Sequence, residues 1–318
     1  MSPGFARGLF SLSFDFELVW GSRDLVADVS DLQRQARITR ERVFPALLAL
    51  LEEHDIVATW ATVGQLFLEA GGPPGHGLVP PNHAWYSAPW FQGIPEGTEA
   101  QHPAFFGRSL ILQLRDAGQE IGSHSFSHPI FGDPGCSRDC AEADLARCVA
   151  EAEVLGIALR SFVFPRNVAG HPELLARHGF TCWRGLEPAW YNRPGIPKAV
   201  GRLAHFSHVS RAACPPTVMP SRDAHGLWNI PASASLLPID GVRRLIPIAQ
   251  RVRRCQRGID QAARDRRIFH LYMHPINLAS APEAMLDALD QVFSHAARRR
   301  DAGDIEILSM GQIAERLN

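Results

Sequence analysis

The sequence predicts an α/β protein that folds as one domain, an incomplete or distorted (β/α) barrel. Short apolar segments alternate with longer amphipathic segments along the 318 residues, as strands alternate with helices in a parallel sheet covered by helices. Six or seven such units fit one barrel better than two domains. Because no internal repeat and no clear linker interrupts the pattern, we expect a single domain over residues 1–318.

Each element is expected from its local pattern. Residues 56–62 are mostly apolar and rich in β-formers, which is typical of a strand buried on both faces, whereas residues 38–53 carry apolar side chains at helical spacing. The same reasoning predicts strands at 9–14, 120–123, 159–164, 179–183 and 267–273, helices at 107–117, 141–155, 172–178 and 282–299, and closing segments at 305–308 and 310–316.

Two segments, about 71–101 and 186–240, break this rhythm. The first is rich in Gly, Pro and aromatic residues. Loops of this length in a compact domain are usually functional, and in barrel proteins the loops that follow the strands build the active site. We therefore expect two long loop insertions beside the functional site.

The composition excludes several classes of function. The chain has 32 Lys and Arg residues against 33 Asp and Glu, whereas a protein that coats nucleic acid or an anionic membrane carries a basic surplus. No segment approaches the ~18 apolar residues that a membrane span needs. The N-terminus lacks a secretory signal pattern and the six cysteines lack a disulfide-scaffold spacing, so we expect a cytoplasmic protein.

A pair of histidines directly follows one of the predicted strands. His124 and His128 stand four residues apart after the strand at 120–123. If this segment turns helically, both imidazoles lie on one face and can bind the same cation. We therefore expect the two side chains to be metal ligands.

A pair of carboxylates ends the first predicted strand. Alternation along an extended strand points Asp15 and Glu17 the same way and Phe14 and Phe16 the other way. Two carboxylates side by side at the end of an apolar strand repel each other unless a metal or a proton offsets the charge. This pair is thus a candidate partner of the two histidines.

Two further strand ends carry polar candidates. Arg166 and Asn167 follow the strand at 159–164, where an arginine can orient a carboxylate by a bidentate contact. His274 stands at the far end of the strand at 267–273 and is a candidate general acid.

These residue types together define a metal-hydrolase site. Two histidines and one carboxylate leave coordination positions open for water and a substrate oxygen, while a second carboxylate can take a proton from the water. Zn²⁺ suits such ligands, and Co²⁺, Ni²⁺, Mn²⁺ and Fe²⁺ fit them too. Whether Asp15 or Glu17 is the metal carboxylate stays open.

The order of these motifs resembles the polysaccharide deacetylase family, the NodB-homology hydrolases of carbohydrate esterase family 4. The family's acidic, His-x-x-x-His, Arg-Pro type and Leu-x-His type motifs correspond here to residues 13–17, 124–128, 164–167 and 271–274. The resemblance covers about residues 8–310. The sequences Ser-Phe-Asp-Phe-Glu-Leu-x-Trp-Gly, Phe-Pro-Arg-Asn and His-Pro-x-Asn-Leu are similar to those of a bacterial subgroup linked to surface polysaccharides such as O-antigen.

The resemblance implies a distorted (β/α)7 barrel and metal-assisted removal of an N-acetyl group from a sugar or sugar conjugate. It also implies a role in surface-polysaccharide or lipopolysaccharide metabolism. By analogy, Asp15 is the general base, and the metal ligands are Glu17, His124 and His128. Arg166 orients the base and His274 is the general acid. The backbone N–H near Asn167 contacts the oxyanion.

Three positions depart from the family's motifs. The usual adjacent aspartates are here Asp15-Phe-Glu17, and Asn167 replaces the usual tyrosine. Trp183-Arg184 stands near the place of the family's Asp-Trp motif, and we expect both side chains to face the substrate.

Aromatic residues in the two long segments are candidates for stacking on sugar faces, or for anchoring the loops to the barrel. They are Trp85, Tyr86, Trp90, Trp190 and Trp228.

Two other functions stay open at this point. A hydrolase of the same fold can act on a non-sugar C–N bond, such as that of a cyclic amide or ureide. Alternatively, the chain can be a catalytically degenerate carbohydrate-binding homologue, which predicts that it binds no metal. Binding to nucleic acid has no basic stripe to support it.

Overall fold

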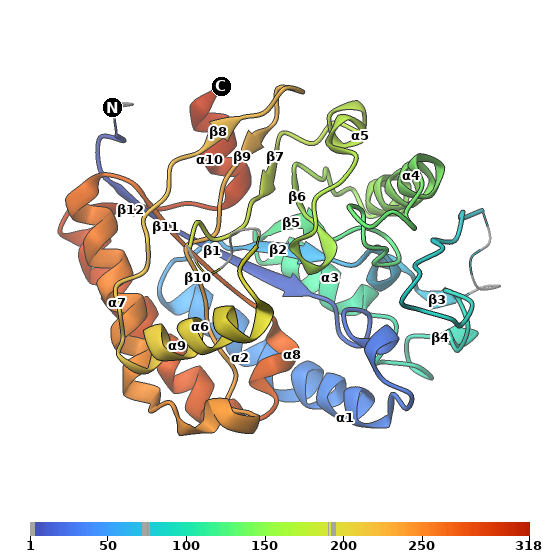
Figure 1. Cartoon of the computed structure of the whole chain (residues 1–318), viewed down its shortest axis with the longest axis horizontal. Helices are drawn as coiled ribbons and strands as arrows, with labels where there is room; N and C mark the ends of the chain where they lie inside the picture. Colours follow the sequence, from blue (N-terminus) through green and yellow to red (C-terminus); the bar gives the residue numbers. More distant parts are fainter. Residues whose placement is uncertain (1–3, 72–74, 76, 190, 192–194) are drawn as a thin grey trace.

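A computed structural model describes residues 4–71, 75, 77–189, 191 and 195–318, and it shows a curled, mostly parallel sheet with helices around its outside (Figure 1). Strand β1 (Gly8–Phe16) lies inside the sheet, parallel to β11 (Ile268–Met273) on one side and β2 (Thr59–Thr62) on the other. Strand β12 (Ile305–Ile307) pairs with the first residues of β1. The fold is the distorted barrel that the sequence predicts, curled into a half-barrel.

The remaining strands extend the sheet from both sides of this centre. In the described residues the strand order is β10-β11-β1-β2-β5-β6-β7-β9-β8, and every pairing along it is parallel except that of β8 with β9. The bounds are β5 (Glu120–Ser123), β6 (Ser161–Val163), β7 (Cys182–Arg184), β8 (Ser221–Arg222), β9 (Trp228–Asn229) and β10 (Ala234–Ser235).

The two faces of β1 meet different surroundings. Phe10, Phe14 and Phe16 point outward into the main hydrophobic core, which lies between the sheet and its helices. Ser13 and Asp15 point to the other side and are also buried. The expected alternation is therefore present, because a strand covered on both faces can direct one row of side chains to the helices and the other to the inside.

Helix α10 (Met310–Leu317) closes the inside at the amino ends of the strands. Its Met310 and Ile313 pack on Leu9 of β1 and Cys182 of β7, in a second apolar cluster. A capping box at Ser309 fixes the start of this helix. Since this end is filled by apolar side chains, the polar side chains gather at the carboxyl ends of the strands, where barrel active sites lie.

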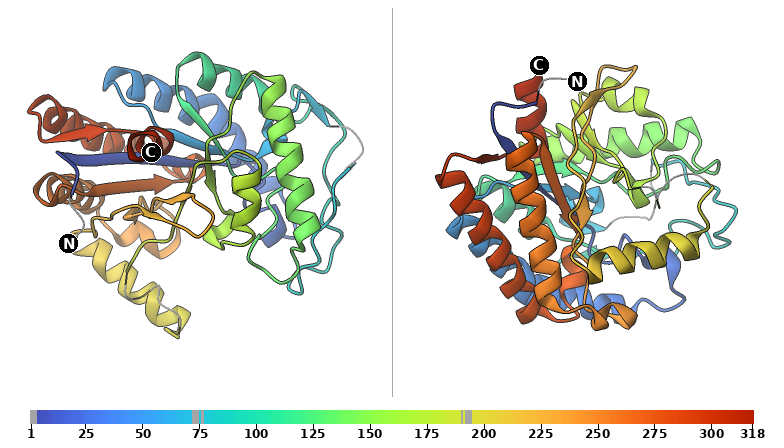
Figure 2. Two further views of the ribbon diagram at one scale, coloured as in Figure 1. Left: turned by 90° about the horizontal axis from the view of Figure 1, so that it is seen from above. Right: turned by 60° about the vertical axis from the view of Figure 1, so that its left-hand side comes forward.

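The other helices pack around the outside, and Figure 2 shows α7 and α9 side by side. In the described part of the chain, no helix combines the length and the apolar character needed to cross a membrane. The helices are α1 (Ser30–Ile38), α2 (Phe44–Glu53), α3 (Arg108–Asp116), α4 (Arg138–Val154), α5 (Pro172–Arg177), α6 (Lys198–Ser210), α7 (Ile248–Asp265), α8 (Pro275–Leu278) and α9 (Pro282–Asp301), with short helical turns at Arg23–Leu25, Thr39–Val43, Gly64–Phe67, Pro165–Asn167 and Gly241–Leu245.

The long segment at 186–240 differs most from its expectation as a loop insertion. It contains helix α6 and the short strands β8, β9 and β10, which extend the sheet at both ends of its order. The segment at 71–101 holds β4 (Gly97–Thr98), which pairs with β3 (Ala70–Gly71), and is otherwise irregular where it is described. The strands in 186–240 are only two residues long, so they leave no periodic pattern in the sequence.

Candidate active site

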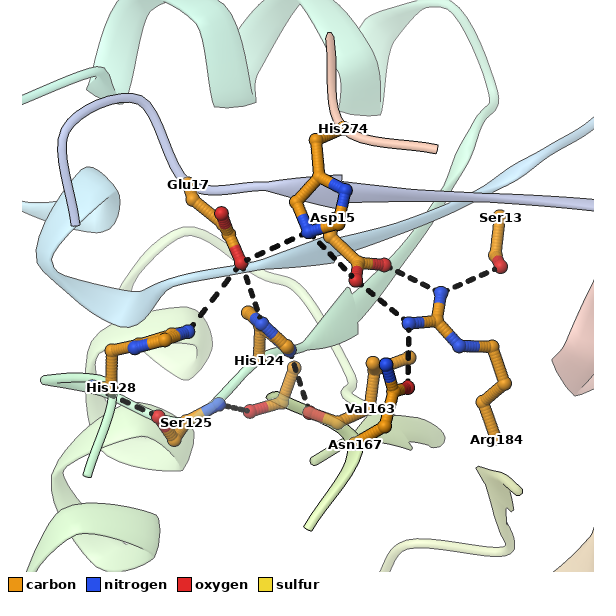
Figure 3. Close-up of polar contacts among 11 residues, drawn as sticks. Ser13, Asp15, Glu17, His124, Ser125, His128, Val163, Asn167, Arg184 and His274 are labelled. Carbon is orange, nitrogen blue, oxygen red and sulfur yellow. Dashed lines mark hydrogen bonds and ion pairs between the residues drawn. The ribbon is translucent and has the colours of Figure 1, made fainter. Parts of the chain in front are cut away.

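Two acidic side chains meet two histidines where β1 and β5 end (Figure 3). Asp15 is 2% exposed and Glu17 6% exposed. Glu17 Oε1 lies 2.9 Å from His124 Nε2 and 3.4 Å from His128 Nε2. The structure thus brings together the three side chains that the resemblance assigned to the metal, with their ligand atoms all within 4.8 Å of one another.

The hydrogen bonds of His124 show that this cluster fits a cation. His124 Nδ1 lies 2.7 Å from the carbonyl oxygen of Val163 and donates its proton there. The neutral imidazole then presents a lone pair at Nε2 toward the Glu17 carboxylate, which is also an acceptor. Two acceptors 2.9 Å apart need a proton or a cation between them. A carbonyl that fixes the tautomer of a histidine in this way is usual at metal sites.

The ligand spacing and the state of His128 support the same conclusion. Tetrahedral Zn²⁺ with ligands at about 2.0–2.1 Å places them roughly 3.3 Å apart, close to the 3.4 Å between His128 Nε2 and Glu17 Oε1. Both ring nitrogens of His128 are buried without a hydrogen-bond partner. Burial lowers the pKa of His128, although Glu17 opposes the shift, so the ring favours the neutral form that binds a metal.

The charges around Glu17 favour its ionised form. Burial alone raises its pKa, but the charge of His274 and the hydrogen bond with His124 outweigh this and hold the pKa of Glu17 well below its ordinary value. For His124, burial lowers the pKa, and the hydrogen bond to Glu17 together with the charge of Asp15 turns the balance so that the pKa is raised. The cluster therefore has the polarity of a cation site.

Arg184 of β7 holds Asp15 in a bidentate ion pair. Its Nη1 donates to Asp15 Oδ1 at 2.5 Å and its Nη2 donates to Oδ2 at 2.7 Å. Burial raises the pKa of Asp15, but Arg184 and then His274 outweigh it, so the pKa lies below its ordinary value. Arg184 is 1% exposed, so it supports the carboxylate and is not the open substrate contact that we expected.

The expectation that Arg166 orients Asp15 is wrong. The backbone turns sharply after β6, with φ of 53° at Arg166, and the guanidinium pairs with the buried carboxylate of Asp24. It also lies over the ring of Trp85, 4.6 Å from the ring centroid. The arginine that meets Asp15 stands on a strand, where alternation turns Arg184 inward and Trp183 outward.

His274 lies on the other side of the two carboxylates. Its Nε2 is 3.5 Å from Asp15 Oδ2 and 3.7 Å from Glu17 Oε1, and its side chain is 32% exposed. It is thus the one histidine of this group that solvent reaches. His270, nearer the start of β11, is fully buried and its Nε2 lies 2.9 Å from Ser13 Oγ.

Asn167 takes part through its side chain. Its Oδ1 accepts a hydrogen bond from Arg184 Nη2 at 3.1 Å. Its backbone N–H donates to the carbonyl oxygen of Phe164 at 2.8 Å and is not free to bind an oxyanion. This corrects the expected oxyanion contact at Asn167, because the turn after β6 uses that N–H.

Of the aromatic candidates, Trp85, Tyr86 and Trp90 pack together, whereas Trp183 lies elsewhere. Trp85 is 43% exposed, but its ring stacks on His83 and contacts Arg166, while Tyr86 packs edge-on against Trp90. Trp183 packs on Phe164 and donates from Nε1 to Asp223, on the outer side of the sheet. Its expected contact with the substrate is therefore wrong.

Trp228 gives no support to a stacking surface. Trp228 donates from Nε1 to Asn318, the last residue of the chain, and so lies away from the cluster. Trp190 lies outside the described residues.

One glycine contributes to the site by having no side chain. A Cβ at Gly21 would lie 1.8 Å from Glu17 Oε2. The chain after β1 folds back over Glu17, since Trp20 N–H donates to the Glu17 carbonyl. Gly21 closes the acidic motif Asp-Phe-Glu-Leu-x-Trp-Gly, but the motif alone does not show that its lack of a side chain matters.

Sequence comparison matches part of the chain to a known family. Residues 33–177 match the family model of polysaccharide deacetylases, a segment that includes the histidine pair but neither β1 nor His274. A search of curated protein sequences finds no significant match.

Solved structures show the same fold over nearly the whole chain. A candidate polysaccharide deacetylase from Mycobacterium smegmatis aligns with a TM-score of 0.64 at 16% identity, covering 99% of this chain and 92% of that one. The Puue allantoinase aligns with a TM-score of 0.61 at 12% identity, covering 96% and 89%. A candidate polysaccharide deacetylase from Pseudomonas aeruginosa PAO1 has the same TM-score and coverage at 11% identity. At such identities the likeness establishes the fold.

Proposed function

We propose that this chain is a metal-dependent hydrolase that removes an N-acetyl group from a sugar or sugar conjugate. The observation that carries the proposal is that a cation site and a candidate base lie side by side at the end of one strand. Glu17 faces two histidines in a cation site, and Asp15 beside it is held ionised by Arg184. The family match over residues 33–177 supports the deacetylase class.

The chain's own residues supply the proton transfers. Asp15 takes a proton from the attacking water, and Arg184 keeps its carboxylate oriented and ionised before the water arrives. His274, on the opposite side, gives a proton to the amine nitrogen as the C–N bond breaks. Water and amide thereby become acetate and a free amine. Glu17, His124 and His128 would hold a divalent cation, which would supply Lewis-acid polarisation at the acetyl carbonyl.

We also propose which metal the site binds and which class of substrate it acts on. Two histidines and a carboxylate favour Zn²⁺ first, with Co²⁺, Ni²⁺, Mn²⁺ and Fe²⁺ as metals that fit the same ligands. We place the substrate among precursors of bacterial surface polysaccharides such as O-antigen. A nucleotide- or lipid-linked N-acetyl sugar in the cytoplasm is the form we propose.

The test is a measurement of acetate release. Purified protein is freed of metal, reloaded with Zn²⁺ or Co²⁺, and incubated with N-acetylhexosamines in free, nucleotide-linked and lipid-linked form, and with allantoin as a cyclic ureide. The proposal expects acetate from at least one N-acetyl sugar, only with metal, and its loss in Asp15→Asn and His274→Ala. Opening of allantoin without acetate release would instead establish the second activity, which the likeness to the Puue allantoinase makes worth including.

A further inference from the structure

The turn between the two histidines is bound by a carboxylate from another element. Asp144 of helix α4 is 2% exposed. Its Oδ1 accepts from the N–H of Phe126 at 2.6 Å, and its Oδ2 accepts from the N–H of Ser127 at 2.9 Å and from the Ser127 hydroxyl at 2.7 Å. All three donors thus come from residues between His124 and His128.

This turn has a backbone that needs support. Ser125 and His128 adopt φ of 64° and 63°, in the left-handed region that costs a non-glycine residue roughly 1–3 kcal/mol. On the inner side, the Ser123 hydroxyl accepts from the N–H of Ser125, and the Ser125 hydroxyl accepts from the N–H of His128. Asp144 holds the turn from the outer side, so the segment is fixed from both directions.

The cost of burying this carboxylate shows that the contact is specific. Burial raises the pKa of Asp144 to about 6, against the opposing effect of the hydrogen bonds from Phe126 and Ser127. An alanine or a leucine would fill the same side of a helix at no such cost. The burial of an acid at this point is therefore best explained by what its oxygens bind, namely the turn between His124 and His128.

We propose that Asp144 is a positioning residue of the metal site, which fixes the turn from residue 124 to residue 128 so that both imidazoles face Glu17 before any cation binds. The inference rests on the proposed metal centre. Partners that orient the ligands of a metal without touching the metal typically contribute 10–100-fold to its affinity. Asp144 should contribute within that range, because it acts on two backbone donors at once.

The first experiment measures the turn itself in the metal-free full-length protein. Hydrogen exchange of the Phe126 and Ser127 amides is compared between wild type and Asp144→Asn, with Asp139→Asn as the matched control, since Asp139 is exposed on the same helix. We expect exchange at both amides to become at least about tenfold faster in Asp144→Asn, as expected for loss of hydrogen bonds to a charged acceptor. Unchanged exchange in a folded Asp144→Asn protein would overturn the proposal.

The second experiment measures Zn²⁺ affinity by competition with a chromophoric chelator, with Co²⁺ absorption as a report on ligand geometry. Asp144→Asn should bind Zn²⁺ about 10–100-fold more weakly and show an altered Co²⁺ spectrum, while Asp139→Asn should match wild type. Ser127→Ala removes only the hydroxyl donor and should weaken binding about two- to tenfold. This variant keeps the test decisive if Asp144→Asn does not fold, and wild-type affinity in Ser127→Ala would then contradict the proposal.

The two experiments separate this inference from the proposed function. If wild-type protein binds no divalent cation, the metal-centre proposal fails, and hydrogen exchange still decides whether Asp144 holds the turn. If wild type binds Zn²⁺ and a folded Asp144→Asn binds it equally well, the metal centre stands and the positioning role is wrong.

Discussion

Arg184 and Asp15 form a bidentate ion pair across the inside of the sheet, although their strands, β7 and β1, are separated in it by three others. Arg184 also donates to Ser13 Oγ at 3.1 Å. The Ser13 hydroxyl can in turn donate to His270 Nε2. Arg184 therefore links the proposed base to the buried interior. Breaking a buried pair of this kind by removing one partner costs about 3–5 kcal/mol of stability.

The first prediction compares Arg184→Lys with Arg166→Lys. Lysine keeps the charge but cannot make two parallel hydrogen bonds to one carboxylate. We expect kcat for acetate release to fall roughly 10²-fold in Arg184→Lys, because Asp15 is no longer oriented as a base. Arg166→Lys should stay within a few-fold of wild type, since a lysine there can still reach Asp24. Equal losses in the two variants would contradict the assignment of the orienting role to Arg184.

The second prediction concerns Gly21→Ala, which changes a residue that supplies no metal ligand itself. The added methyl group meets the Glu17 carboxylate, a flexible side-chain end that can move aside. We therefore expect little loss of stability and at least about tenfold weaker Zn²⁺ binding, as for other changes that displace a ligand. Gly107→Ala is the control, because a Cβ there meets its nearest neighbour at 3.5 Å. Wild-type Zn²⁺ affinity in Gly21→Ala would place the metal elsewhere.

The third prediction is a pH dependence of stability that originates at His270. Burial, with the charge of Arg184 second, lowers the pKa of His270 to about 3 from 6.5. Below about pH 6.5 the unfolded chain takes up a proton that the folded protein excludes, so stability falls as the pH falls from about 6.5 toward 3. The loss from this residue is at most about 1.4 kcal/mol per pH unit.

The measurement is urea unfolding of wild type and His270→Asn at several pH values below neutrality. Other groups also titrate in this range, so the informative quantity is the difference between the two slopes of unfolding free energy against pH. The slope should be smaller in His270→Asn by about 1 kcal/mol per unit. His225→Asn, at an exposed histidine, should keep the wild-type slope. Parallel slopes for wild type and His270→Asn would contradict the account.

The parts of the site that lie at strand ends could be predicted from the sequence. Asp15, Glu17 and His274 follow recognisable strands, and the period of two along a strand sets the direction of the first two. His124 and His128 follow a strand too, and their spacing brought both rings to Glu17, although the turn that carries them is not a helix. These features depend on local pattern, which a sequence displays directly.

The parts that depend on contacts across the fold could not be predicted in this way. Arg184 pairs with Asp15 because Arg166 pairs with a different buried carboxylate, that of Asp24. Asp24 belongs to no recognisable motif, so the sequence did not indicate this pairing. Asp144 stands on a helix with no signal that it bonds a turn before that helix. The predicted elements also omit helix α7, on which Arg251 and Arg254 are buried beside apolar residues.

We propose above all that Glu17 binds a cation together with the two histidines, while the ionised carboxylate of Asp15, paired with Arg184, serves as the base. The most direct test is Zn²⁺ affinity and acetate release in wild type, Asp15→Asn and Glu17→Gln. We predict a single Zn²⁺ per chain in wild type and in Asp15→Asn, with acetate release about 10²–10⁴-fold slower in the latter. Glu17→Gln should lose tight Zn²⁺ binding. Wild-type Zn²⁺ affinity in Glu17→Gln, or a wild-type chain that binds no divalent cation, would contradict the account.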